Sequence, residues 1–562
     1  MTTRNVFSRR DFIRGVGASV LAASAVVRSA NVLADQDAAQ PFQHGVASGD
    51  PLADRVIIWT RVTPKHPSPV IVQWEVARDA AFRRVIRHGH ALTSAHKDFT
   101  VKVDVLGLPP AAKLFYRFRV HGQFSTVGRT RTLPVGAIDQ VKLAVFSCAN
   151  YPAGYFHVYA EAAKLDDVFA SVHLGDYIYE YGRDGYASTD AYALGREVEP
   201  ANELLALSDY RRRYAQYRSD LDLQAMHAAM PMIAVWDDHE ISNDTWREGA
   251  QNHNPATEGS FAVRRAAAIR AYHEWLPTRL PNPNKPEQIY RSFKFGNLLS
   301  LHMLDTRVIA RDRQLDYANY IGATGFDSAR FGADMTDSSR QMLGAEQTGW
   351  LTQRMAQSNT TWDVLGQQVL MGRMNIPAPL VLGQISFTDY STLVYKAQTD
   401  PASLTAADMA VLSQPAIPYN LDAWDGYAVA RETVLGTARA LDKNLVVLSG
   451  DTHNAWASDL DDYAGNPVGV EFATSSVSSP GLEEYFPDEN PLAVAAGLSQ
   501  IIGPLQYADT HQRGFMIVTA TQAECQAEWR YVDTVKSLNY SVVPGPILRT
   551  LPGVGNRRVV PV

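Results

Sequence analysis

Hydrophobic and polar residues alternate in short blocks over residues 42–135. The block Leu114–Val120 has an apolar side chain at every second position, which is the period of a strand with one buried face. The blocks Val70–Val76 and Val101–Val105 are rich in β-branched residues, and turn signals such as Gly49-Asp50-Pro51 separate the blocks. Several short strands so close together predict a small β-sandwich.

A different pattern begins after residue 138, where short and almost continuous apolar runs are separated by long polar or helical stretches. Such runs are typical of strands that are buried on both faces, as in an α/β layer fold. Between two of the runs, residues Tyr210–Met230 have a helical pattern that stops at Pro231. The five runs are Leu143–Phe146, Val168–Leu174, Met232–Trp236, Leu298–Leu304 and Leu445–Leu448.

The first residues of the chain have the pattern of an export signal. Residues 8–13, Ser-Arg-Arg-Asp-Phe-Ile, precede an apolar stretch at Val16–Val27, and small residues then lead to Ala34. The paired arginines are typical of a twin-arginine signal, with an ordinary secretory signal as the alternative. We therefore expect cleavage after Ala34 and export by the twin-arginine machinery, so that the mature protein is periplasmic or secreted.

Length and composition limit the alternatives. A chain of 562 residues, with 46% hydrophobic and 20% charged residues, is typical of a globular protein of two or three domains. The patterns predict a signal peptide at 1–34, a β-sandwich domain at 35–137 and an α/β domain at 138–562. No apolar run of about 18 residues follows the signal, so we expect no stable membrane insertion. The formal net charge of −7 gives no indication of a nucleic-acid or anionic-membrane surface.

Each of the five apolar runs is followed directly by residues that carry chemistry. Ligand sites of α/β sheets gather beyond the carboxyl ends of the strands, so these segments are expected to form one site. The segments are Ser147-Cys148-Ala149-Asn150, Gly175-Asp176-Tyr177-Ile178-Tyr179, Trp236-Asp237-Asp238-His239-Glu240, Asp305-Thr306-Arg307 and Gly450-Asp451-Thr452-His453-Asn454.

The residue types in these segments favour metal-dependent chemistry at phosphorus. Carboxylates, a phenolate and a thiolate together can hold a highly charged cation such as ferric iron, with a second oxygen-loving cation nearby. A metal pair clamps the oxygens of an in-line displacement and yields a metal-bound hydroxide near neutral pH. Histidine and arginine then offset charge on the phosphoryl oxygens. The sequence contains neither a serine nucleophile elbow nor a phosphate-binding glycine loop before Lys-Ser/Thr.

Each signal also has a simpler interpretation. Cys148 could be a buried core residue, or it could pair with Cys525 in a disulfide, although a chain of this size does not need one. Arg307 could pair with a surface carboxylate, and the acidic cluster at 237–240 could cap a helix. The shared position of all five segments at strand ends favours a single site.

In their order along the chain, these motifs resemble those of the PhoD-type alkaline phosphatases, a branch of the metallophosphoesterases. The resemblance spans about residues 42 to 530. The motifs that carry it are Gly45-Val46-Ala47-Ser48-Gly49-Asp50-Pro51, Trp59-Thr60-Arg61, Ser147-Cys148, Gly175-Asp176-x-x-Tyr179, Trp236-Asp237-Asp238-His239-Glu240, Leu304-Asp305-Thr306-Arg307, Leu343-Gly344-Ala345-Glu346-Gln347, Gly366-Gln367-Gln368, Trp424-Asp425-Gly426-Tyr427, Gly450-Asp451-Thr452-His453, Glu471-Phe472, Ser475-Ser476 and Arg513-Gly514-Phe515.

The resemblance implies an α/β fold: a four-layer αββα metallophosphoesterase sandwich at 138–562, which would be the catalytic domain, preceded by an immunoglobulin-like β-sandwich. It implies alkaline phosphatase and phosphodiesterase activity with ferric iron, Fe(3+), and calcium, Ca(2+). Cys148, Asp176, Tyr179 and Asp451 would surround the iron. Asp176 would bridge to the calcium, for which Asp238 is a candidate ligand.

The resemblance also suggests the residues that act on the ester. His239 and Arg307 are candidates for contacting phosphate. Asp237 is grouped with these catalytic residues and His453 with the metal ligands, without a more specific role. The residues from Gln384 to Pro418 lie between two motifs, and we expect them to shape the entrance and influence the choice of substrate.

Three hypotheses remain at this point. The first is an exported, monomeric enzyme that hydrolyses small phosphate monoesters and diesters. The second is a phospholipase D-like phosphodiesterase that uses the same site; the net charge weighs against specific nucleic-acid substrates. The third is a non-catalytic exported binding protein with an inactive site.

Overall fold

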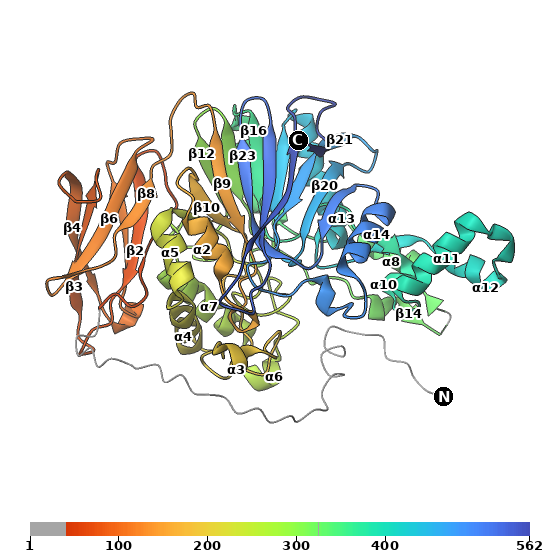
Figure 1. Ribbon diagram of the computed structural model, residues 1–562, viewed down its shortest axis with the longest axis horizontal. Helices are drawn as coiled ribbons and strands as arrows, with labels where there is room; N and C mark the ends of the chain where they lie inside the picture. The colour runs from red at the N-terminus through yellow and green to blue at the C-terminus, as the bar shows by residue number, and fades with distance from the viewer. Residues whose placement is uncertain (1–40, 324) are drawn as a thin grey trace.

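Two large β-sheets lie at the centre of the computed structural model, which describes residues 41–323 and 325–562 (Figure 1). One sheet has ten strands and the other has seven. In spatial order, the ten are β26 (Val560–Pro561), β25 (Val542–Thr550), β24 (Cys525–Val532), β23 (Arg513–Ala520), β9 (Val141–Phe146), β10 (Ala170–His173), β11 (Met232–Ala234), β1 (Val46–Gly49), β2 (Arg55–Arg61) and β5 (Thr100–Leu106). The seven are β12 (Arg291–Phe295), β13 (Leu299–Met303), β16 (Trp362–Gly366), β19 (Leu445–Ser449), β21 (Pro467–Ala473), β20 (Ala455–Asp461) and β22 (Leu505–Asp509).

The five predicted apolar runs are confirmed as the strands β9, β10, β11, β13 and β19. β9, β10 and β11 pair in parallel, and so do β13, β16, β19 and β21. Val145 and Val172 of the first sheet share one hydrophobic cluster with Leu301 and Val364 of the second. The apolar side chains on both faces of these strands are therefore explained by a sheet on one side and helices on the other.

Helices cover the outer face of each sheet, which confirms the predicted four-layer αββα arrangement. The ten-stranded sheet packs against α2 (His157–Ala163), α4 (Leu207–Arg218), α5 (Leu221–Ala229) and α7 (Phe261–Trp275). The seven-stranded sheet packs against α9 (Gly344–Gln357), α13 (Ala428–Ala440) and α14 (Pro491–Ile501).

The stretch Tyr210–Met230 is helical as predicted, but it is divided between two separate helices, α4 and α5. Asp220 interrupts them with an extended backbone, φ −66° and ψ 128°. Its side chain accepts hydrogen bonds from the backbone N–H groups of Asp222 (3.0 Å) and Leu223 (3.1 Å), and so caps the start of α5. The apolar period continues across this break, which is why the sequence pattern hid it.

The N-terminal β-sandwich is confirmed, but one of its two sheets is not its own. A five-stranded sheet consists of β4 (Val85–Thr93), β3 (Val70–Ala77), β6 (Lys113–Val120), β7 (Gln123–Phe124) and β8 (Gly128–Arg131). It packs on β1, β2 and β5 through a core that includes Val72, Val76 and Ile58. These three strands continue the ten-stranded sheet, because β1 pairs in parallel with β11 at Gly49 and Met232.

An excursion from the seven-stranded sheet projects at the right of Figure 1. It includes the residues from Gln384 to Pro418, which we expected to shape the entrance of the site. Its elements are β14 (Ile321–Gly322), β15 (Gly325–Phe326), α8 (Ser328–Met335), β17 (Asn375–Pro377), α10 (Ala378–Val381), α11 (Phe387–Thr399), α12 (Ala406–Leu412) and β18 (Ala416–Pro418). Two further short helices, α3 (Ala191–Leu194) and α6 (Pro255–Glu258), lie in the loops beyond β10 and β11.

Further sequence expectations concern the export signal, membrane-spanning segments and the cysteines. The predicted export signal lies outside the described residues. None of the helices within 41–323 and 325–562 is long and apolar enough to cross a membrane. Cys148 and Cys525 are both buried and both free, so the disulfide that the sequence left open is not formed.

A buried ion pair between Asp50, which follows β1, and Arg291 on β12 joins the two sheets. Asp50, fully buried, accepts hydrogen bonds from Nε (2.8 Å) and Nη2 (2.6 Å) of Arg291 on β12. It also accepts one from the backbone N–H of Arg279 at 2.6 Å. Removing the carboxylate would leave the Arg291 charge without its partner in a low-dielectric environment.

We therefore expect Asp50→Ala to lower the free energy of unfolding by about 3–5 kcal/mol. Asp54→Ala is the matched control, because the Asp54 side chain is exposed and pairs only with its neighbour Arg55 among the described residues. Urea unfolding followed by tryptophan fluorescence measures both. Equal losses for the two variants would contradict the structural role of the Asp50–Arg291 pair.

Candidate active site

The carboxyl ends of β9, β10, β11, β13, β16 and β19 converge on one site between the two sheets. Two glycines allow the close approach. A Cβ atom on Gly175, after β10, would lie 2.3 Å from Cβ of Asp237, after β11. A Cβ atom on Gly450, after β19, would lie 2.6 Å from Cβ of Ser147, after β9. The expectation that the strand ends would meet is therefore met by backbones in direct contact.

One glutamine ties the two sheets together at this edge. Gln368, after β16, donates from Nε2 to the carbonyl oxygens of Trp236 (2.6 Å) and Leu304 (3.0 Å). Its Oε1 accepts from the backbone N–H of Thr306 at 3.2 Å. The ends of β11, β13 and β16 are thus fixed relative to one another.

Four candidate site residues have a left-handed backbone. The φ angles are 61° at Cys148, 54° at Asp176, 63° at Asp451 and 64° at His453. This region is uncommon for residues with a Cβ atom and is concentrated at functional sites. It turns each chain sharply at the end of its strand, so that the side chain is presented to the neighbouring strand ends.

Glu240 holds two of these loops in place. Its buried carboxylate accepts hydrogen bonds from the backbone N–H groups of Asp176 (3.0 Å), Tyr177 (2.5 Å) and Asp237 (2.6 Å). Burial raises the pKa of Glu240 to about 7, although these N–H groups favour its charged form. Glu240 therefore acts on the backbone of the site rather than on a ligand.

The first group of metal-binding atoms lies around Cys148. Ligand atoms of Cys148, Asp176 and His453 lie within 4.8 Å of one another. The Tyr179 hydroxyl joins this group, because it donates to Oδ2 of Asp176 at 3.1 Å and lies 3.1 Å from Nε2 of His453. Ser479 donates to the same hydroxyl oxygen at 2.8 Å. A thiol, a phenol, a carboxylate and an imidazole thus face one small volume.

Two further groups continue from the first. Ligand atoms of Asp176, Asp238 and His239 lie within 4.8 Å of one another, and so do those of Asp237, Asp238 and Asp451. Asp176 belongs to the first and second groups, and Asp238 to the second and third. The three groups therefore form a continuous array in which carboxylates are shared, as a bridged metal pair requires.

The array fits bound cations better than it fits the protein alone. Oδ1 of Asp176 and Oδ2 of Asp237 are buried and have no hydrogen-bond partner among the described residues. Burial raises the pKa of Asp176 and of Asp237 well above the usual range for aspartate. Burial, followed by the charge of Asp176, likewise raises the pKa of the Cys148 thiol. A cation among these groups would favour their ionised forms and satisfy the unpaired oxygens.

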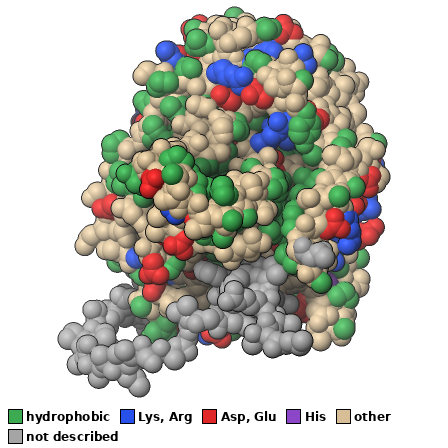
Figure 2. Space-filling view, turned by 90° about the vertical axis from the view of Figure 1, so that its right-hand side faces the viewer, with side chains coloured by type: hydrophobic (Ala, Val, Ile, Leu, Met, Phe, Trp, Pro, Cys, Tyr) green, Lys and Arg blue, Asp and Glu red, His purple; other side chains and the backbone are tan. Residues whose placement is uncertain are grey.

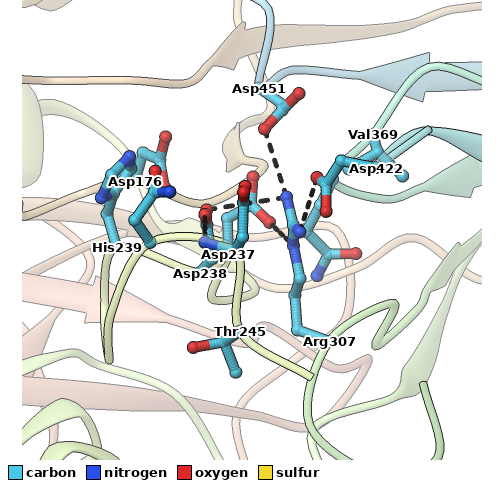
Figure 3. Close-up of polar contacts among 12 residues, drawn as sticks. Asp176, Asp237, Asp238, His239, Thr245, Arg307, Val369, Asp422 and Asp451 are labelled. Atoms are coloured by element: carbon cyan, nitrogen blue, oxygen red, sulfur yellow. Dashed lines mark hydrogen bonds and ion pairs between the residues drawn. The ribbon is translucent and has the colours of Figure 1, made fainter. Parts of the chain in front are cut away.

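Arg307 lies on the other side of the array, fully buried (Figure 3). It donates from Nε to Asp237, from Nη1 to Asp422 at 2.7 Å and from Nη2 to Asp451 at 3.2 Å. Asp238 lies 3.6 Å from Nη2. Burial alone would lower the pKa of the guanidinium, but these four carboxylates outweigh it and raise the pKa. Arg307 is thus a permanent cation next to the candidate metal positions.

Asp422 is a site residue that the sequence analysis missed. It lies between two buried arginines, because Arg311 also donates to its carboxylate, and from Nη2 to its carbonyl oxygen at 2.5 Å. The signal for it was weak: it stands two residues before the Trp424-Asp425-Gly426-Tyr427 motif and belongs to no motif itself. Its position next to Arg307 follows only from the tertiary fold.

Glu180 is the second missed residue. Its carboxylate lies 2.7 Å from Nδ1 of His239 and accepts from the backbone N–H of Asn243 at 2.7 Å. Burial opposes the charged form of His239, but Asp238, Glu180 and Asp176 outweigh it and raise the imidazole pKa well above its usual value. The His239 ring also stacks on Tyr179, with 4.2 Å between ring centroids. Its adjacency to Tyr179 in the sequence was the available signal for Glu180.

All nine residues that the sequence analysis proposed lie together in this array. They are Cys148, Asp176, Tyr179, Asp237, Asp238, His239, Arg307, Asp451 and His453. Asp305, from the same segment as Arg307, instead caps the turn: it accepts from the backbone N–H groups of Arg307 (2.8 Å) and Val308 (2.9 Å). One arrangement differs from the expectation, because Asp451 groups with Asp237 and Asp238 rather than with Cys148.

The comparisons with known proteins agree with this architecture. Residues 143–529 match the family model of the PhoD-like phosphatases, and residues 26–134 match the model of the N-terminal domain of PhoD-like phosphatases. Alkaline phosphatase D of Bacillus subtilis (strain 168) is 34% identical over 558 residues, which cover 94% of this chain and 85% of that protein. A solved structure of PhoD is 31% identical, with a TM-score of 0.76, over 93% of this chain and 92% of that one.

We expect Glu240→Gln to reduce the hydrolysis of an aryl phosphate by about 10–100-fold, the usual cost of losing a group that supports metal ligands. A glutamine amide offers one acceptor oxygen and directs its NH₂ group at backbone donors. Glu471→Gln is the matched control, because Glu471 is equally buried and accepts from the backbone N–H groups of Met371 and Gly372, outside the array. A similar loss of activity in both variants would mean that the effect is a general loss of stability.

Proposed function

The chain belongs to the PhoD-like phosphatase family and is a metal-dependent phosphoric ester hydrolase, and we propose that its site hydrolyses phosphate monoesters and diesters by direct attack of water, without a covalent enzyme intermediate. The observation that carries this proposal is the array of shared carboxylates beside the buried Arg307. Such an array provides positions for two cations and an adjacent fixed positive charge.

We assign Cys148, Asp176, Tyr179 and Asp451 to ferric iron. Asp176 would also hold calcium, together with Asp238. When bound, the two metals would supply Lewis-acid charge at phosphorus and lower the pKa of coordinated water. The mixture of thiolate, phenolate and carboxylate donors supports a highly charged first cation, and the oxygen donors at Asp238 support calcium.

Asp451 and His453 come from the same turn and serve different sides of the site. Asp451 groups with Asp237 and Asp238 rather than with Cys148, and we propose that it reaches the iron position from that side. His453 has its Nδ1 atom 2.7 Å from the carbonyl oxygen of Pro480, which directs Nε2 toward Tyr179 and the iron position. His453 therefore acts as a ligand or orients the phenolate ligand.

Arg307 and His239 bind the phosphoryl group in this proposal. Asp237 and Asp422 hold the guanidinium in a fixed orientation, so its charge can offset the charge that develops on the phosphoryl oxygens. Glu180 holds Nδ1 of His239, and the opposite ring nitrogen is left to donate to an oxygen of the ester. The charged side chains of Arg307 and His239 are therefore in position before the substrate binds, which avoids reorganisation during the reaction.

We further propose that the enzyme is exported by the twin-arginine machinery and acts as a monomer in the periplasm or outside the cell. The paired arginines at positions 9 and 10 support this proposal. This route suits a protein whose metals are inserted before export.

Metal analysis tests the iron position. We expect protein purified without added metal to contain about one iron per chain, with calcium, and Cys148→Ala to lose the iron together with its visible absorption. Cys525→Ala is the matched control, because Cys525 is also free and fully buried but lies on β24, outside the array. Elemental mass spectrometry measures both variants. An unchanged iron content in Cys148→Ala would mean that this cysteine is a buried core residue and not a metal ligand.

The stereochemical course tests the absence of a covalent intermediate. Single-turnover hydrolysis of a chiral, isotopically labelled phosphate ester should proceed with inversion at phosphorus, because one direct displacement inverts and two displacements retain. Retention would require a nucleophilic side chain and would contradict the proposal.

Rates on mono-aryl and bis-aryl phosphates, measured with the same preparation, then distinguish a phosphatase from the phospholipase D-like alternative that prefers diesters.

A further inference from the structure

The net charge of −7 hides an uneven distribution of charge along the chain. Residues 41–135 contain 14 lysine and arginine residues but only 6 aspartate and glutamate residues, a formal charge of +8. Residues 136–562 contain 33 lysine and arginine residues and 50 aspartate and glutamate residues, a formal charge of −17. The N-terminal domain is therefore strongly basic although the whole chain is acidic, and the total charge alone gave no indication of this.

Most carboxylates of the N-terminal domain are already paired with arginines away from its outer sheet. Asp50 pairs with Arg291, Asp54 with Arg55, Asp98 with Arg61 and Asp104 with Arg279. The remaining two acids of residues 41–135 are Glu75 and Asp79. Both lie on or next to the five-stranded sheet, where lysine and arginine residues outnumber them.

The outer face alternates with the core along β6. Leu114, Tyr116, Phe118 and Val120 are buried, whereas Lys113 and Arg119 are exposed and Arg117 is half-buried on the opposite face. The turn between β3 and β4 adds the exposed Arg83 and Arg84. We call the surface formed by Arg83, Arg84, Lys113, Arg117 and Arg119 the basic face.

Two aromatic rings hold the central arginine of the basic face. The Arg117 guanidinium lies 4.0 Å from the ring centroid of Phe82 and 4.0 Å from that of Phe124. Arg119 lies 5.1 Å from the same Phe124 ring. Glu75 pairs with Arg117 at 2.8 Å, so this arginine is fixed in place while its neighbours remain exposed. The face is ordered rather than a loose collection of long side chains.

Exposed hydrophobic side chains share this sheet. Ile71 and Leu92 stand directly opposite each other on β3 and β4 and are 63% and 67% exposed, and Phe124 is 47% exposed. A surface that combines arginines with exposed aliphatic and aromatic groups fits the interface of an anionic bilayer, where headgroups meet the first acyl carbons. A purely electrostatic partner such as a nucleic acid has no use for Ile71 and Leu92.

The position of the sheet suits a docking surface. It forms one end of the molecule, opposite the end that carries α11 and α12 (Figure 1). Figure 2 views that opposite end, where acidic, basic and hydrophobic side chains are interspersed. The acidic body of the catalytic domain would therefore face away from a negatively charged surface when the basic face binds it.

We propose that the outer face of the five-stranded sheet docks the enzyme peripherally on an anionic phospholipid surface. The arginines and Lys113 contact the headgroups, and Ile71, Leu92 and Phe124 reach the interfacial region. This docking does not depend on the metal assignment, and hydrolysis of a soluble aryl phosphate reports separately on the folded active site.

Vesicle co-sedimentation tests the proposal with the full chain. We expect binding to mixed phosphatidylcholine–phosphatidylglycerol vesicles, none to phosphatidylcholine alone, and weakening by salt. Arg83→Gln with Arg119→Gln should weaken binding by roughly 30-fold, since each basic residue near an anionic surface contributes about a factor of five. Arg212→Gln with Arg354→Gln is the matched control, because it removes the same charge from exposed positions on α4 and α9.

A second pair of variants distinguishes a lipid surface from another polyanion. Ile71→Gln with Leu92→Gln should lose vesicle binding while aryl phosphate hydrolysis is unchanged. Vesicle binding that survives these two substitutions, or that is matched by binding to duplex DNA, would replace the lipid surface with a general polyanion and overturn the proposal. The absence of binding by the wild type, or an equal loss in the Arg212 and Arg354 control, would also overturn it. Arg84→Gln with Lys113→Gln repeats the test if the first pair folds poorly.

Discussion

Negative charge gathered at a buried site is the constraint on which the rest of this structure depends. The strand ends of two sheets place Asp176, Asp237, Asp238 and Asp451 in overlapping groups, and within each group the ligand atoms lie within 4.8 Å of one another. All four residues are buried or nearly so. Like charges in a low-dielectric environment repel strongly, and each also loses its hydration. The protein offsets this with Arg307 and with His239, and the sharing of carboxylates leaves positions for cations to complete the balance.

A second layer of buried groups keeps that arrangement in register. Glu240 accepts from the loops after β10 and β11, and Gln368 binds the ends of three strands. Asp422 and Glu180 hold Arg307 and His239 from behind. These residues make hydrogen bonds within the protein rather than to a ligand, and they account for the fixed orientation of the Arg307 and His239 side chains. The geometry of the site is thus fixed by buried hydrogen bonds to the loops that follow the strands.

The sequence predicted the members of the site better than their arrangement. Strand ends with reactive residues indicated Cys148, Asp176 and Arg307, because ligand sites of α/β folds gather there. Asp422 belongs to no motif, and neither does its partner Arg311, so only the tertiary fold brings them to the site. The left-handed backbone at Cys148 also leaves no signal in a sequence without glycine there. In the fold, the layers were predictable from apolar runs, whereas the break between α4 and α5 was not.

The pairing of β1 with β11 has a consequence for the order in which the protein is made. β1 ends at Gly49, but its partner Met232 is synthesised only after all of the helices α2 to α5. The N-terminal strands therefore cannot complete their sheet as the ribosome releases them, and their edge must wait for a distant part of the chain. The N-terminal domain is consequently not an exchangeable module: its removal would expose the edge of β11 and open the catalytic sheet.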